Sequence, residues 1–102
     1  MEKVKKALDD LISAISEAEV CKEYERAKKS ITKDEMDKIN EYKEMKKAAI
    51  SSCSNEEAVR AEAFFTKLVL NTRMRRYIIN EKKLSELIVE IYDKIGSKLI
   101  EE

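Results

Sequence analysis

The sequence contains no proline, no histidine and no tryptophan, and its only glycine is Gly96. Tight β-hairpins depend on glycine, asparagine or proline at their turns, so this composition predicts an all-α fold. Without histidine the chain cannot build a His-dependent catalytic triad, an HExxH zinc site or a haem site with a histidine ligand. A single glycine also excludes glycine-rich phosphate-binding loops. We therefore expect no catalytic residues and no enzyme activity.

The chain has two cysteines, Cys21 and Cys53, and no CxxC pair. Isolated cysteines of this kind favour free thiols over a structural disulfide. Two thiols cannot complete a four-ligand site within one chain, so we expect no metal and no cofactor, although a dimer could bring four together.

No apolar run approaches the roughly 20 residues that span a bilayer. The N-terminus MEKVKKALDD is too polar for a signal peptide. These features predict a cytoplasmic protein without membrane insertion. Charged residues make up 41% of the chain, and 21 basic side chains balance 21 acidic ones. This balance excludes DNA binding and disfavours RNA as a partner.

Hydrophobic periodicity predicts five helices in one domain that spans residues 1–102. The apolar sets of residues 4–15 and 20–31 would point to opposite sides of one continuous helix, so a break must separate them. Capping-box spacing places helix starts at Ser16 with Glu19, Thr32 with Glu35, and Ser54 with Glu57. The polar residues 51–55 form the predicted main loop.

The fifth predicted helix, residues 71–100, is the longest, and Asn71 is a good N-cap for it. About 29 residues at 1.5 Å each give a rod of roughly 43 Å, whereas a compact domain of this size has a radius of gyration of about 13 Å. We therefore expect a dimer in which one side of this helix packs on its own chain and another on a partner. The predicted interface residues are Tyr77, Glu81, Leu84, Leu87, Ile88, Ile91, Tyr92 and Ile95.

Four charged residues of this helix allow alternative interpretations. Glu81 interrupts the apolar stripe, and a carboxylate there is either tied by a basic or tyrosine side chain or selects the partner. Arg73, Arg75 and Arg76 oppose the helix dipole in the first turn. They either pair locally with acidic side chains or contact an acidic partner or an RNA backbone.

Two stretches of the chain resemble the YlbF/YheA/YmcA family of small helical bacterial proteins. The first leads from Ser16-Glu17 to Glu23-Tyr24 and Ala27. The second is the stronger and runs through Leu70, Asn71, Met74, Tyr77, Glu81, Leu84, Leu87, Ile88, Ile91 and Ile95. The chain is most similar to the short, YheA-like members. It stops at Glu102 without the cysteine-bearing tail of some relatives, which argues against an iron–sulfur cluster.

The resemblance implies a dimeric helical bundle with a regulatory role and no enzyme activity. Longer members act in multi-protein complexes that influence competence, sporulation, biofilm formation and RNA processing by a membrane-anchored endoribonuclease. We therefore expect a cytoplasmic adaptor that forms a homodimer or binds related regulators or such a ribonuclease complex. The alternative is an RNA-binding or iron–sulfur (cofactor-binding) accessory module.

Overall fold

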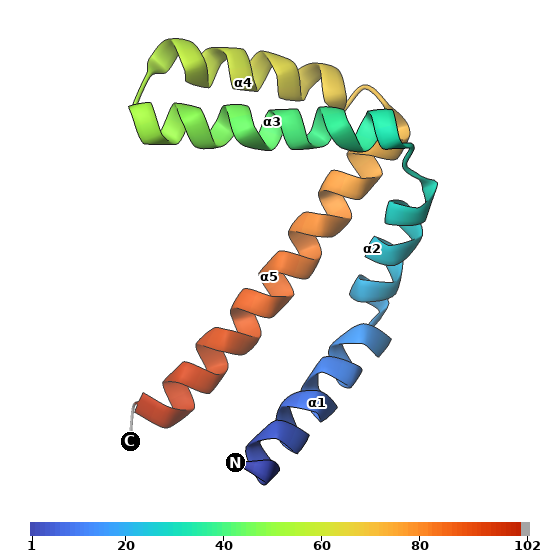
Figure 1. The fold of residues 1–102 in the computed structure, drawn as a ribbon, viewed down its shortest axis with the longest axis vertical. Coiled ribbons are helices and arrows are strands. Elements are labelled where there is room, and N and C mark those ends of the chain that lie inside the picture. Colours follow the sequence, from blue (N-terminus) through green and yellow to red (C-terminus); the bar gives the residue numbers. More distant parts are fainter. Residues whose placement is uncertain (101–102) are drawn as a thin grey trace.

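A computed structural model describes residues 1–100 as five helices and no strand. The five helices are α1 (Glu2–Glu17), α2 (Glu19–Ser30), α3 (Lys33–Ser52), α4 (Asn55–Leu68) and α5 (Thr72–Ile100). The prediction of an all-α fold with a long C-terminal helix is confirmed (Figure 1).

The helices are arranged as a bent molecule and not as a closed bundle. The α3–α4 hairpin lies across one end of two long arms, one made of α1 and α2 and the other of α5 (Figure 1). The longest dimension is 47 Å, and the Cα radius of gyration is 17.3 Å. A compact chain of this length would have about 13 Å. The expectation that α5 extends well beyond the core is therefore met.

The starts of α3 and α5 follow the sequence signals. The Thr32 hydroxyl accepts the Glu35 backbone N–H at 3.2 Å, and the Glu35 carboxylate accepts the Thr32 backbone N–H at 3.0 Å, so the predicted capping box is complete. At the start of α5, the Asn71 side-chain oxygen accepts the Met74 backbone N–H at 3.0 Å. These bonds satisfy backbone donors that a helix N-terminus leaves unpaired.

Of the other two predicted caps, the one at Ser54 forms and the one at Ser16 does not. The α1–α2 break falls at Ala18, which has no side-chain cap, and Ser16 lies within α1, where its hydroxyl donates to the Ile12 carbonyl at 2.7 Å. Ser54 caps α4 by accepting the Glu57 backbone N–H at 3.3 Å. The loop before it is shorter than predicted, because α3 continues to Ser52 and ends at Cys53 in the left-handed conformation.

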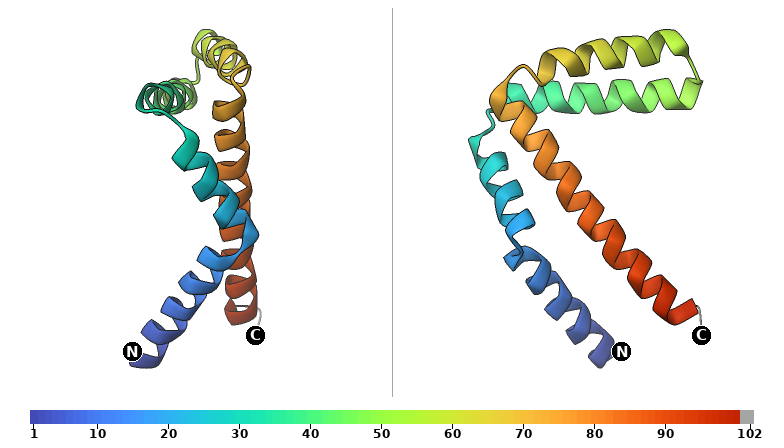
Figure 2. Two further views of the ribbon diagram at one scale, coloured as in Figure 1. Left: turned by 90° about the vertical axis from the view of Figure 1, so that its right-hand side faces the viewer. Right: turned by 180° about the vertical axis from the view of Figure 1, so that it is seen from behind.

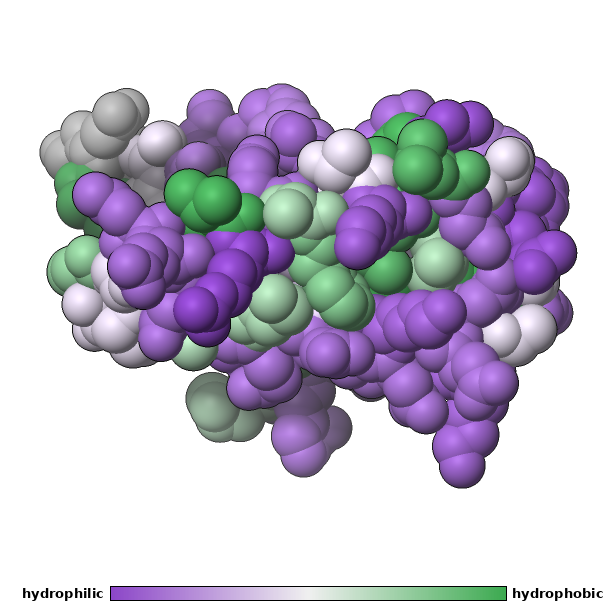
Figure 3. Space-filling view, turned by 90° about the horizontal axis from the view of Figure 1, so that it is seen from above, coloured by the Kyte–Doolittle hydropathy of each residue, from purple (hydrophilic) through white to green (hydrophobic). Residues whose placement is uncertain are grey.

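The core lies where the hairpin meets the two arms. Its buried residues are Ala27, Ile39, Leu68, Met74 and Tyr77, with Tyr24, Ile31, Met36, Tyr42, Phe64 and Ile78 partly buried against them. Within the hairpin, the Tyr42 and Phe65 ring centroids are 5.0 Å apart. Seen from above, the surface is largely hydrophilic with an apolar band across its middle (Figure 3).

The far ends of the two arms separate. α5 packs mainly on α2, and α1 packs on α2. Beyond the break at Ala18, α1 turns away from α5, as the left view of Figure 2 shows. As a result α1 contains no buried residue. The break therefore leaves the distal half of α5 without a long neighbour.

Candidate interaction surface

Tyr77 lies at the centre of the junction between α2, α3 and α5. Its ring centroid is 5.5 Å from that of Tyr24 on α2, and the two hydroxyls are 3.2 Å apart. The Tyr77 hydroxyl also donates to Glu81 Oε2 at 3.1 Å. Burial raises the pKa of Tyr77, and the Tyr24 hydroxyl and the Glu81 charge raise this pKa further. Tyr77 therefore stays neutral, and at 4% exposure it lies almost entirely within its own chain.

Glu81 is tied to the neighbouring helix α3. Lys43 Nζ donates to Glu81 Oε2 at 2.8 Å, and the same ammonium lies 6.0 Å from the centroid of the Tyr77 ring. The Glu81 side chain keeps 30% of its surface exposed. This geometry corresponds to the first interpretation of Glu81, a carboxylate held by basic and tyrosine side chains. A role in partner selection stays a prediction.

A second polar tie joins α3 to the start of α5. Arg73 Nε and Nη2 donate to the Glu35 carboxylate at distances of 3.1 and 2.7 Å, and Asn71 Nδ2 donates at 3.0 Å. Arg73, followed by the Thr32 backbone N–H and Asn71, lowers the pKa of Glu35 to about 2 against the opposing effect of burial. Glu35 was predicted only as a capping residue. No sequence pattern points to a partner 38 positions away.

The three arginines of the first turns of α5 have different environments. Arg73 is engaged with Glu35, and Arg76 Nη2 lies 3.5 Å from Glu23 Oε2 on α2. Arg75 is exposed and forms no ion pair within residues 1–100. Local pairing thus accounts for two of the three. Contact of these arginines with an acidic partner stays a prediction, and Arg75 is the best placed for it.

The predicted interface residues fall into two groups along α5. Tyr77 and Glu81 are committed to the junction, and Leu84, Leu87 and Ile91 are half-buried. Farther along, Ile88, Tyr92 and Ile95 are 37%, 72% and 43% exposed, and Leu99 continues the row. The distal half of α5 is therefore the part of the predicted interface that remains open to a partner.

The same end of the molecule carries exposed apolar side chains on α1. Val4, Leu8 and Ile12 all lie on its apolar face and are more than half exposed. The sequence predicts that these residues share one face of the first helix, but the direction that α1 takes after the break cannot be deduced from periodicity. We define the distal rows as Val4, Leu8 and Ile12 of α1 together with Ile88, Tyr92, Ile95 and Leu99 of α5.

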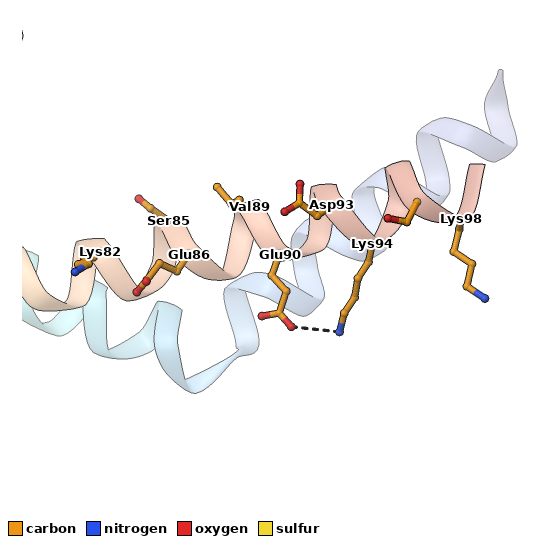
Figure 4. Close-up of a pocket in the computed structure, with 9 residues that line it drawn as sticks. Lys82, Ser85, Glu86, Val89, Glu90, Asp93, Lys94 and Lys98 are labelled. Atoms are coloured by element: carbon orange, nitrogen blue, oxygen red, sulfur yellow. Dashed lines mark ion pairs between the residues drawn. The ribbon is translucent and has the colours of Figure 1, made fainter. Parts of the chain in front are cut away.

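An open groove runs along α5 on the side away from its row of exposed apolar residues (Figure 4). It is lined by Lys82, Ser85, Glu86, Val89, Glu90, Asp93, Lys94, Ser97 and Lys98, all from this one helix. Lys94 Nζ and Glu90 Oε1 are 3.2 Å apart. Basic and acidic side chains are mixed along the groove and are solvent-exposed, so they complement no ligand of one charge. The groove is best described as the solvated face of an amphipathic helix.

The remaining chemistry of the described chain is sparse. Cys21 is half-buried, Cys53 is exposed, and both thiols are free. Within residues 1–100, no three cysteine, aspartate or glutamate side chains lie together in a way that would hold a metal ion. In the same range, no helix combines the length and the apolar character that crossing a membrane requires.

Fold and surface together define a small all-helical protein whose distinctive features are polar ties at a junction and exposed apolar rows beyond it. Residues 4–100 match the family described as "Control of competence regulator ComK, YlbF/YmcA". The chain therefore belongs to the YlbF/YmcA family, and the resemblance predicted from its motifs is confirmed. This description names a regulatory role and no reaction. No curated protein and no solved structure matches the chain.

Proposed function

We propose that this chain is a non-enzymatic cytoplasmic adaptor that regulates by helix-mediated contacts with other proteins, beginning with a second copy of itself. Membership of a regulatory family supports the role. The single observation that carries the mechanism is the exposure of the distal rows, since seven large apolar side chains at one end are between 37% and 74% exposed. The free thiols of Cys21 and Cys53 fit a reducing compartment.

The exposed apolar area of the distal rows is large enough to favour contact with a protein partner over contact with solvent. Full burial of a Val, Leu or Ile side chain contributes about 1.5–3 kcal/mol at roughly 25 cal/mol per Å², which corresponds to roughly 60–120 Å² each. Seven partly exposed side chains thus offer several hundred Å² of apolar surface. A stable interface buries about 800 Å² per partner, part of it polar.

A second copy is the simplest partner for such a surface. A twofold-symmetric dimer uses the same patch on both subunits, so apolar rows that need cover can cover each other. The physiological partners that we propose beyond the homodimer are related regulatory proteins or an endoribonuclease complex. The exposed Arg75 and the mixed charges along α5 offer the polar contacts that such partners need.

Self-association is tested by sedimentation equilibrium at micromolar concentrations. We expect the wild type to approach twice the chain mass of 11.9 kDa. Leu8→Glu and Leu99→Glu should shift the population towards monomer, because each places a charge in a distal row. The matched control is Val59→Glu, which changes a residue of α4 that is 68% exposed and lies outside these rows. A wild-type mass of one chain throughout would contradict the proposal.

A further inference from the structure

No contact within residues 1–100 explains why position 96 is a glycine. Gly96 lies inside α5, where glycine destabilises a helix relative to alanine. A Cβ atom built at this position would meet no atom of the described residues within 4 Å. The residues one turn before and one turn after, Tyr92 and Ile100, are 72% and 83% exposed. Gly96 is therefore the floor of a notch between large exposed apolar side chains.

The residues beside this notch have coiled-coil spacing. Ile88, Tyr92, Ile95 and Leu99 are separated by four, three and four positions, the alternation that places side chains along one helical seam. All four belong to the distal rows. Gly96 lies on the flank of this seam, about 40° around the helix from Tyr92 at 100° per residue. A helix packed on the seam would thus pass close to the backbone of Gly96.

We propose that two copies of α5 pair in antiparallel orientation, and that Tyr92 of the partner subunit packs on Gly96. This inference rests on the homodimer proposed above and specifies its orientation and register. In this register Ile88 packs beside Leu99 of the partner subunit, and Tyr92 packs beside Ile95 of the partner subunit. The notch at Gly96 accommodates the tyrosine ring. The α1 residues of the distal rows add the remaining contact area.

The alternative parallel pairing fits the observations less well. It would align the two Gly96 notches at one level and leave both unfilled. In the antiparallel register each Tyr92 ring has a notch to occupy.

The first experiment measures how Gly96→Ala changes self-association and helix content. Alanine favours a helix, and the single chain has room for its methyl group. Ordinary helix propensity therefore predicts unchanged or tighter association. The proposed packing predicts the opposite, a dissociation constant raised about tenfold or more, the equivalent of about 1.4 kcal/mol. Circular dichroism should show no loss of helix. Ser97→Ala is the matched control, since Ser97 lies on the solvated face.

The second experiment tests the register by disulfide trapping in a Cys21→Ser, Cys53→Ser background. Ile88→Cys and Leu99→Cys proteins are oxidised separately and then as a mixture. We expect a disulfide-linked dimer in the mixture and little in either protein alone. Neither Ile88 nor Leu99 belongs to the buried core cluster or to the residues packed against it.

Three outcomes would overturn the inference. Linked dimers of each single-cysteine protein alone would show a parallel pair, and a Gly96→Ala protein that associates as tightly as wild type would show that nothing packs on the notch. Either result leaves the homodimer itself in place. A wild type that stays monomeric in sedimentation would remove the inference together with the homodimer on which it rests.

Discussion

The tie between Lys43 and Glu81 provides the most direct test of how the α3–α4 hairpin is held on α5. We expect Lys43→Met to destabilise the fold, because among residues 1–100 it leaves the half-buried Glu81 carboxylate with only the Tyr77 hydroxyl as a donor. We expect Glu81→Leu to be close to neutral or stabilising. In that variant the Tyr77 hydroxyl still has the Tyr24 hydroxyl at 3.2 Å, and leucine extends the apolar stripe.

The size of the expected destabilisation follows from the exposure of the Lys43 and Glu81 side chains. Exposed ion pairs contribute about 0–1 kcal/mol, whereas removing one partner of a fully buried pair costs about 3–5 kcal/mol. The Lys43 and Glu81 side chains are 41% and 30% exposed, so this pair lies between the two limits and nearer the first. We expect Lys43→Met to cost about 1–2 kcal/mol, and about 1 kcal/mol shifts the melting temperature of such a domain by roughly 4–8 °C.

The assay is urea unfolding followed by circular dichroism, with all proteins at one concentration because self-association adds to apparent stability. Lys47→Met is the control: this lysine lies one turn farther along α3 and pairs with Glu44, and both side chains are 76% exposed. The reasoning is refuted if Lys43→Met and Lys47→Met have equal midpoints. It is also refuted if Glu81→Leu is less stable than Lys43→Met.

Three further predictions concern Glu35 and the two cysteines. Because the Glu35 pKa is lowered from 4.5 to about 2, its contribution to stability is present above pH 4.5 and lost as the pH falls towards 2; urea midpoints should fall over this range, and less steeply in Glu35→Gln. Cys53 adopts φ 53° at the end of α3, so Cys53→Gly should stabilise the fold by up to about 1 kcal/mol and Cys53→Val should destabilise it, as measured by thermal unfolding. In the native protein a thiol reagent should modify the exposed Cys53 faster than Cys21, both should react after unfolding, and elemental analysis should find no stoichiometric iron or zinc.

The elements of this fold could largely be predicted from the sequence because their signals are local. The Thr32–Glu35 capping box, the Asn71 cap and the apolar stripe of α5 each involve residues within a few turns. The cap predicted at Ser16 was wrong for a local reason as well. Ser16 remains in the last turn of α1, two residues before the N-cap position at Ala18, and its hydroxyl donates to the Ile12 carbonyl of its own helix.

The candidate site could be predicted only in part because it depends on how the elements meet. The stripe of α5 indicates which residues are apolar, yet it does not distinguish Tyr77, which is 4% exposed, from Tyr92, which is 72% exposed. That difference arises from the position of the hairpin and from the turn at Ala18. The partners of Glu81 and Arg73 lie 38 positions away in sequence, and no periodicity encodes such a pairing.

The polar ties fix the orientation of the α3–α4 hairpin, and this orientation decides which part of α5 stays exposed for the proposed dimer. α3 and α4 extend across the end of α5 (Figure 1), so they cover its first turns and leave the row from Ile88 to Leu99 uncovered. The Glu35–Arg73 and Lys43–Glu81 pairs join α3 to α5 at two points, about two turns apart on each helix. Two such points fix the angle between α3 and α5, whereas a single point would let the helices rotate about it. The polar junction therefore holds the hairpin away from the distal rows, and the surface that we propose for a second copy stays open.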